Sequence, residues 1–150
     1  MMKTERVILL VEDNPDDVEL TRLALEENNL ANKVVIAQDG AEALHYLLDW
    51  SDQETSAPTQ PVLVLLDLKL PKVDGLEVLR TIRADERTHL LPVVILTTSN
   101  EEHDLLASYD LGANSYVRKP VDFNQFVEAV REMGLYWLGI NEPPPVRARR

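Results

Sequence analysis

Four short, mainly aliphatic segments and a fifth, more polar one recur along the chain at intervals of about 25 to 30 residues, and polar residues follow most of them. The segments are Val7–Val11, Lys33–Ala37, Val62–Leu66, Pro92–Thr97 and Ser115–Arg118. A short unbroken apolar run bounded by turn signals is typical of a strand buried on both faces, as in a parallel sheet. Val62–Leu66 contains only Val and Leu, so we expect it to be the central strand.

Between these strands, apolar residues recur three or four positions apart, which is the spacing of amphipathic helices. The predicted helices begin near Asn14, Gly40, Gly75, Asn100 and Asp122, and the last two end near Gly112 and Met133. Asn14 and Asn100 are the expected N-caps of their helices. Strand and helix therefore alternate five times, which predicts right-handed crossovers and a doubly wound α/β fold with a five-stranded parallel sheet.

Length and composition favour a single domain over residues 1–150, with a core at about 6–135 and an aromatic extension at 136–150. The net charge of −11 argues against nucleic-acid binding. There is no cysteine, no apolar stretch of about 18 residues and no signal-peptide pattern, so we expect a cytoplasmic protein without a membrane partner. Ser51–Pro61 is polar and predicts a surface loop, and the basic tail Arg147–Arg150 predicts a solvated terminus.

Acidic residues follow two of the predicted strands. Glu12 and Asp13 come directly after the first strand, and Asp67 comes directly after the third. In a flavodoxin-like strand order of 2-1-3-4-5 these two strands are neighbours, so the three carboxylates converge at one crevice. Two unit charges about 4 Å apart repel by roughly 4 kcal/mol at an effective dielectric of about 20, so the group requires a cation. Oxygen ligands with room for water suit Mg²⁺.

Thr97 and Lys119 follow the fourth and fifth strands and are expected at the same edge of the sheet. A hydroxyl and an ammonium beside a metal-bound carboxylate suit a phosphoryl group, and Asp67 is then a nucleophile that forms an aspartyl phosphate. Each of these residues alone is explained as well by an ordinary solvated strand end or turn. Together, on four strand ends that face one way, they indicate a phosphoryl-transfer site.

The motifs ILLVEDNPDD, VLLDLKLPKVDG, VVILTTS and YVRKP occur in an order and spacing that resemble the response-regulator receiver domains, the CheY-like family, over residues 6–135. The resemblance implies that Asp67 is the phosphoacceptor. It also implies that Asp13, Asp67 and the backbone carbonyl of Lys69 bind Mg²⁺ directly and that Glu12 acts mostly through water.

By the same resemblance, Thr97 and Lys119 hold the phosphoryl oxygens and Tyr116 is an aromatic switch. We expect Tyr116 to turn inward only after Thr97 has turned toward the phosphoryl group. The Lys119–Pro120 bond is expected to be cis, and positions 69 and 99 are ones that tune phosphoryl lifetime in the family. The implied function is a stand-alone response regulator that accepts a phosphoryl group from a histidine kinase and has only self-phosphorylation and autodephosphorylation chemistry of its own.

Within the family, the chain most resembles stand-alone receivers paired with bacterial phytochrome histidine kinases. The polar segment before the central strand, the sequence Leu96–Ser99 and the aromatic segment Leu135–Leu138 carry this finer resemblance. One alternative is a receiver-like interaction module that is never phosphorylated. Another is a phosphatase of the haloacid dehalogenase kind, which Lys69 argues against because that chemistry needs a carboxylate two residues after the nucleophile.

The apolar segment after Met133 suggests an interface. Tyr136, Trp137 and Leu138 lie in a terminal region, where aromatic residues are unusual unless they are buried. We expect a twofold homodimer formed by the fourth helix, the fifth strand and the last helix, with these three residues extending the contact. The alternative is that the segment folds back onto its own domain.

Overall fold

The computed structural model describes residues 6–27, 33–49 and 60–145, and these residues form a five-stranded parallel sheet. The strands are β1 (Val7–Val11), β2 (Lys33–Ala37), β3 (Leu63–Leu66), β4 (Val93–Thr97) and β5 (Ser115–Arg118). Their order across the sheet is β2-β1-β3-β4-β5, which confirms the predicted doubly wound fold. All of the β1, β3 and β4 residues are buried, as their continuous aliphatic sequences predict.

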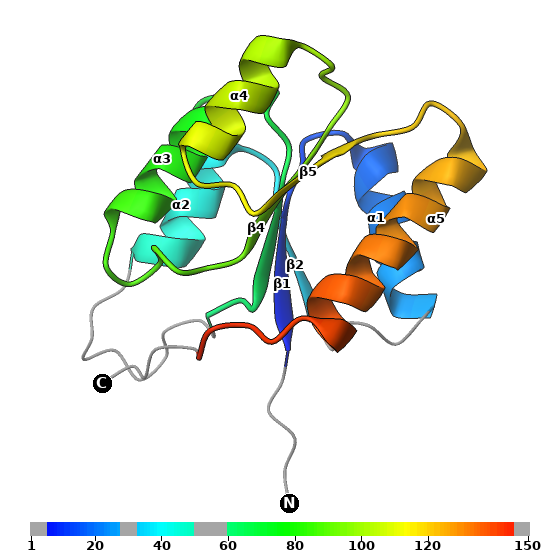
Figure 1. The fold of residues 1–150 in the computed structure, drawn as a ribbon, viewed down its shortest axis with the longest axis horizontal. Coiled ribbons are helices and arrows are strands. Elements are labelled where there is room, and N and C mark those ends of the chain that lie inside the picture. Colours follow the sequence, from blue (N-terminus) through cyan, green and yellow to red (C-terminus); the bar gives the residue numbers. More distant parts are fainter. Residues whose placement is uncertain (1–5, 28–32, 50–59, 146–150) are drawn as a thin grey trace, which may run out of the picture.

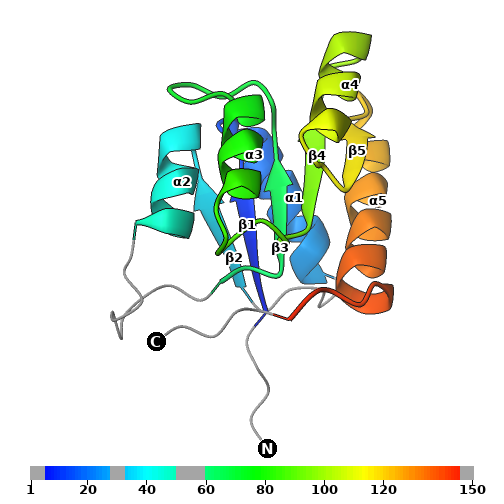
Figure 2. The ribbon, with the colours of Figure 1, turned by 60° about the vertical axis from the view of Figure 1, so that its left-hand side comes forward.

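Five helices cover the two faces of the sheet (Figure 1). They are α1 (Pro15–Glu27), α2 (Gly40–Leu48), α3 (Gly75–Ala84), α4 (Glu102–Asp110) and α5 (Phe123–Gly134). Figure 2 shows α1 and α5 on one side of the sheet and α2 and α3 on the other. This arrangement follows from right-handed crossovers that change face at the point where the strand order reverses.

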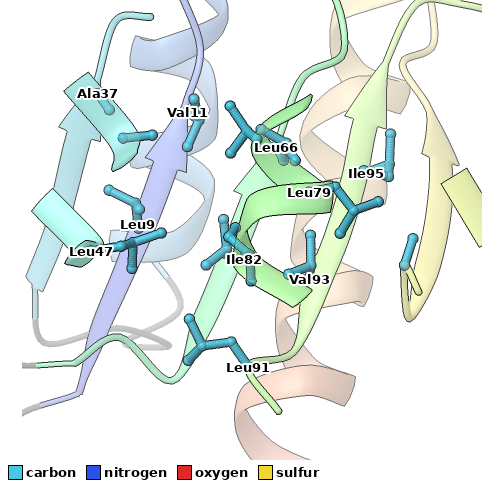
Figure 3. Packing of buried hydrophobic residues seen from close by; sticks show 14 of the residues in the cluster. Leu9, Val11, Ala37, Leu47, Leu66, Leu79, Ile82, Leu91, Val93 and Ile95 are labelled. Atoms are coloured by element: carbon cyan, nitrogen blue, oxygen red, sulfur yellow. The ribbon is translucent and has the colours of Figure 1, made fainter. Parts of the chain in front are cut away.

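Alternating residues of the strands build two separate cores. On the α2–α3 side the buried cluster includes Leu9, Leu66 and Ile95, together with Leu79 and Ile82 of α3 (Figure 3). On the α1–α5 side the strand residues of opposite parity, such as Leu10, Leu65 and Val94, pack with residues of those helices. Because successive side chains of a strand point to opposite faces, an unbroken aliphatic strand supplies both cores at once.

Of the two asparagines predicted to cap helices, one does so in the structure and the other does not. The Asn14 Oδ1 atom accepts hydrogen bonds from the backbone N–H groups of Asp16 and Asp17, so Asn14 caps α1 as predicted. The prediction that Asn100 caps α4 is wrong, because Glu101 occupies the N-cap position and its side chain makes no capping hydrogen bond. The Ser99 hydroxyl instead accepts from the backbone N–H of Glu101, at 3.3 Å, which satisfies this donor without an asparagine cap.

The α-helix α5 ends at Gly134, close to the predicted end near Met133, but the chain remains helical beyond it. A six-residue π-helix, η1 (Leu135–Ile140), continues directly from α5. Leu138 is only 3% exposed and belongs to the core on the α1–α5 side, and its carbonyl accepts a hydrogen bond from the Arg6 guanidinium. Trp137 packs against the same core, while Tyr136 is 47% exposed and meets the Trp137 ring edge-on at 5.1 Å. Folding back onto the domain therefore accounts for Leu138 and Trp137, and Tyr136 alone of the three predicted contact residues is largely exposed.

Two other predicted segments fall wholly or partly outside the described residues. The basic tail lies outside them, as does most of the predicted loop Ser51–Pro61, of which Gln60 and Pro61 are described and buried. Among the described residues, no helix is both long enough and apolar enough to cross a membrane.

The strand register places the functional candidates at one edge. Val11 is level with Leu66 in neighbouring strands, and Thr97 is level with Arg118. Glu12, Asp67 and Lys119 are therefore each the first residue beyond a strand, at the carboxyl edge of the sheet.

The close approach of α2 to the loop after β3 requires glycine at position 40. A Cβ atom on Gly40 would lie 1.8 Å from the backbone oxygen of Val73. Gly139, by contrast, has no neighbouring atom within 4 Å of the position its Cβ would take.

We predict that Gly40→Ala lowers the free energy of unfolding by at least about 2 kcal/mol, because the methyl group overlaps backbone that cannot move aside easily. Gly139→Ala is the matched control and should change stability by less than about 1 kcal/mol, in the favourable direction, because alanine is the better helix former. Urea unfolding of the two variants beside the wild type measures both effects. Equal stability of the two variants would contradict the proposed close contact.

Candidate functional site

The centre of the site is the ammonium group of Lys119, which lies directly after β5. Its Nζ atom contacts three carboxylates: Glu12 Oε1 at 2.5 Å, Asp17 Oδ2 at 2.9 Å and Asp67 Oδ2 at 3.1 Å. The Lys119 side chain is 3% exposed, and those of Glu12 and Asp67 are 3% and 9% exposed. A single buried cation thus joins the ends of β1, β3 and β5 to the first turn of α1.

Burial and charge act in opposite directions on these groups. Burial raises the pKa of Glu12 to about 7, even though the hydrogen bond and the charge of Lys119 lower it, and the neighbouring charge of Asp67 raises it further. Burial alone would lower the pKa of Lys119, but its bonds to Asp17 and Glu12 and the charge of Asp67 outweigh burial, and the pKa is raised. Lys119 is therefore firmly charged, while Glu12 takes up a proton more readily than an exposed glutamate does.

Asp17 was not among the residues that the sequence analysis assigned to the site. Its place in the first turn of α1 is explained by the favourable interaction of an acidic residue with the helix N-terminus. The structure shows a second role, since Asp17 reaches Lys119 across 102 residues of sequence. The only hint in the sequence is that Asp17 follows closely on Glu12 and Asp13, which does not reveal the direction of its side chain.

The predicted acidic group is present. One carboxylate oxygen from each of Glu12, Asp13 and Asp67 lies within 4.8 Å of the others, and Asp13 is exposed to solvent. The backbone N–H of Lys69 donates to Asp67 Oδ1 at 3.2 Å, and that of Asn14 donates to Glu12 Oε2 at 3.1 Å. This geometry brings together the oxygen ligands that a hard divalent cation prefers.

A cavity of about 530 Å³ opens beside the acidic group. Its lining comes from the loops that follow β1 and β3 and from the first turns of α3 and α4: Asp13, Leu68, Lys69, Leu70, Pro71, Asp74, Leu76 and Asp104. The exposed carboxylate of Asp13 and the Lys69 residue are thus reachable from solvent through one opening.

Thr97 and Tyr116 meet at Ser99. Thr97 is fully buried, and its hydroxyl accepts a hydrogen bond from the Ser99 backbone N–H at 3.4 Å. The Tyr116 hydroxyl donates to the Ser99 carbonyl at 3.1 Å, and its ring packs against the α2–α3 core. Tyr116 therefore already lies inward in this structure, although this position was expected only after Thr97 turns.

The sequence of the chain resembles those of a known protein family. The chain matches the response regulator receiver domain over residues 8–131. It belongs to this family.

Several regulatory proteins are similar to this chain. A curated relative, the probable methanogenesis regulatory protein FilR2 of Methanothrix harundinacea, is 43% identical over 138 residues, which are 92% of this chain and 87% of that protein. The phosphorylated cyanobacterial phytochrome response regulator RcpA is 39% identical, with a TM-score of 0.88 over 95% of this chain and 100% of that one. The bacteriophytochrome response regulator AtBRR is 54% identical, with a TM-score of 0.70 over 93% and 100% of the two chains. The resemblance to phytochrome-linked receivers is thereby confirmed.

One feature expected of the receiver differs in the structure. The Lys119–Pro120 bond was expected to be cis, but it is trans, as are all peptide bonds among the described residues. The trans isomer of a bond before proline is favoured by about 0.5–1 kcal/mol when the surroundings do not select the other form. Lys119 reaches its three carboxylates from the trans arrangement.

We predict that Lys119→Met lowers the free energy of unfolding by about 3–5 kcal/mol at pH 8, because it leaves buried carboxylates without their cation. Lys72→Met is the matched control, since Lys72 is 71% exposed and pairs with Asp39 at 3.5 Å. An exposed pair of this kind contributes about 0–1 kcal/mol. Urea unfolding of both variants measures the difference.

The loss in Lys119→Met should shrink at pH 5. The pKa of Glu12 is raised from 4.5 to about 7 in the folded protein. Protonated Glu12 therefore contributes fully to the free energy of unfolding below pH 4.5, and this contribution is lost as the pH rises through 7. Without Lys119 the pKa rises further, and protonation at pH 5 relieves the repulsion. A loss that stays constant between pH 5 and pH 8 would contradict the assigned role of Lys119.

Proposed function

We propose that this receiver accepts a phosphoryl group on Asp67 from a histidine kinase, with Mg²⁺ bound at the neighbouring carboxylates, and that the modification changes its binding to a partner. The observation that carries the proposal is the placement of Asp67 beside one buried ammonium group and two further acidic residues at the carboxyl edge of the sheet. A nucleophilic carboxylate, a fixed positive charge and oxygen ligands for a cation are the parts that phosphoryl transfer requires.

In the transfer, a carboxylate oxygen of Asp67 forms a bond to phosphorus as the bond from phosphorus to the imidazole nitrogen of the kinase histidine breaks, and the bonding electron pair leaves with that nitrogen. Lys119 lies 3.1 Å from Asp67 Oδ2 and offsets the charge of the phosphoryl oxygens. The Thr97 hydroxyl accepts from Ser99 and retains its own proton, which it can donate to a phosphoryl oxygen.

The residues present fit Mg²⁺. Asp13, Asp67 and the backbone carbonyl of Lys69 would hold the ion, and Glu12 would act through water. When bound, Mg²⁺ neutralises charge on the phosphoryl oxygens. Lys119 already satisfies Glu12 and one oxygen of Asp67, so the exposed Asp13 carboxylate supplies most of the negative charge that attracts the ion.

The relatives support a phytochrome-type histidine kinase as the phosphoryl donor. RcpA and AtBRR are both phytochrome response regulators, and AtBRR is 54% identical to this chain. FilR2, which is 43% identical to this chain, is by contrast a probable methanogenesis regulatory protein. A receiver-like module that is never phosphorylated is the second candidate, and the complete set of site residues favours phosphorylation over it.

We predict that incubation with acetyl phosphate and Mg²⁺ adds the mass of one phosphoryl group to the intact protein. Asp67→Asn should add none, because it lacks the nucleophilic oxygen. Asp13→Asn should slow the reaction by at least about tenfold at limiting Mg²⁺, because it removes the most accessible carboxylate of the proposed metal site. Lys72→Met, which alters an exposed lysine that pairs with Asp39 and not with the carboxylates of the site, should react as the wild type does. A wild-type mass that does not change would refute the proposed function.

We also propose a twofold homodimer through α4, β5 and α5. On α4, Leu106 and Tyr109 are 62% and 51% exposed, and Tyr136 after α5 is 47% exposed. Leu106 and Tyr109 are three residues apart and so lie on one side of α4, and exposed apolar side chains grouped in this way are typical of an interface core. Trp137 and Leu138 are left out of the revised contact, because they pack against their own core.

We predict that sedimentation at tens of micromolar shows a dimer for the wild type and a monomer for the double variant Leu106→Ser/Tyr109→Ser. Leu90→Ser is the control, because Leu90 is 60% exposed but lies in the turn before β4. A wild type that sediments as a monomer with and without acetyl phosphate would exclude the dimer.

A further inference from the structure

Asp104 and Ser99 form a buried pair beside the site. The Ser99 hydroxyl donates to Asp104 Oδ2 at 2.6 Å, and each residue is 8% exposed. Asp104 belongs to the first turn of α4, and Ser99 lies in the short loop that joins β4 to that helix. A hydrogen bond to a buried carboxylate is stronger than one between neutral groups, so this pair fixes the loop to the helix.

The backbone of Ser99 contacts both proposed switch residues. Its N–H donates to the Thr97 hydroxyl, and its carbonyl accepts from the Tyr116 hydroxyl. The position of Ser99 therefore determines whether Tyr116 finds an acceptor on the inside of the domain. Asp104 touches neither Thr97 nor Tyr116 by any hydrogen bond that the structure shows, but it holds the residue that touches both.

Apart from Asp104, few side chains of α4 are buried against the rest of the domain. Asp104 and Ser108 are the buried residues of the helix, and the Ser108 hydroxyl has no hydrogen-bond partner among the described residues. Leu106 and Tyr109, which are more apolar, are mostly exposed. Because so little apolar surface of α4 is buried, the bond from Asp104 to Ser99 has a larger share in holding the loop than a polar contact usually has.

Asp104 also contacts the loop that carries the phosphoacceptor. Lys69 Nζ lies 3.9 Å from Asp104 Oδ2, and the Lys69 backbone N–H donates to Asp67 Oδ1. Both Lys69 and Asp104 line the cavity beside Asp13. Asp104 thus stands between the loops that follow β3 and β4.

We propose that Asp104 is a positioning residue of the switch. Through Ser99 it fixes the carbonyl that keeps Tyr116 inward, and it therefore sets the fraction of molecules with Tyr116 inward before any phosphoryl group is present. Phosphorylation can move Tyr116 inward only in those molecules in which it is still outward, so the starting population sets the size of the response. The link to phosphorylation rests on the proposed function, whereas the effect of Asp104 on Tyr116 does not.

The test uses ¹⁹F NMR of the full chain labelled with 3-fluorotyrosine, with the Tyr116 resonance assigned by its loss in Tyr116→Phe. Its solvent exposure is measured from the shift between H₂O and D₂O. Asp104→Ala should lower the ratio of inward to outward Tyr116 by about tenfold, which is the equivalent of one hydrogen bond to a charged group. Ser99→Ala should have the same effect, and the double variant should lower the ratio no further than either single change.

Two variants separate positioning from a general effect on the helix. Asp104→Asn keeps an oxygen that accepts from Ser99, and it should restore most of the inward population. Ser108→Ala removes an unpartnered hydroxyl from the same face of α4 and should leave the Tyr116 resonance unchanged. If Asp104→Ala does not fold, Ser99→Ala and Asp104→Asn test the same bond.

The proposal is overturned if the Tyr116 resonance of both Asp104→Ala and Ser99→Ala equals that of the wild type, even where the melting temperature falls. Acetyl phosphate and Mg²⁺ added to Asp104→Ala should return Tyr116 inward. A wild type that takes up no phosphoryl group overturns the proposed function alone, because the comparison of unphosphorylated variants still decides the role of Asp104.

Discussion

The buried ammonium group of Lys119 is the interaction on which the site depends. It lies among the carboxylates of Glu12, Asp17 and Asp67, which would repel one another without it. A buried cation with a single carboxylate partner would not recover its lost hydration, but three partners raise its pKa despite the burial. Burial raises the pKa of Glu12 to about 7 although its contacts with Lys119 lower it. The protonation of Glu12 is therefore sensitive to any further charge that binds at the site.

The sheet makes that arrangement possible because it holds the three strand ends at one level. The strands β1 and β3 are neighbours in the centre, and their aliphatic side chains fill both cores, so their ends have little freedom to move. Glu12, Asp67 and Lys119 each directly follow a strand of this sheet. The charges of the site are thus held together by the sheet, at the place where parallel α/β sheets generally bind ligands.

The residues of the proposed switch meet at the loop between β4 and α4. Ser99 joins Thr97, Tyr116 and Asp104 within this loop, and the helix that follows buries little apolar surface. Under the proposed switch, a small difference in free energy at this loop would change the fraction of molecules with Tyr116 inward. The C-terminal segment contrasts with it, since Leu138 is packed firmly into the core on the opposite face.

The pattern of apolar and polar residues by itself determined the five strands, their helices and five of the site residues: Glu12, Asp13, Asp67, Thr97 and Lys119. This was possible because the strands are continuous aliphatic segments and the residues that follow parallel strands must lie at one edge. Only the tertiary structure decided that Asp17 reaches Lys119, that Asp104 binds Ser99, that Leu138 enters the core and that the bond before Pro120 is trans. These features depend on side-chain directions and on contacts between distant segments, and local periodicity carries no information about either.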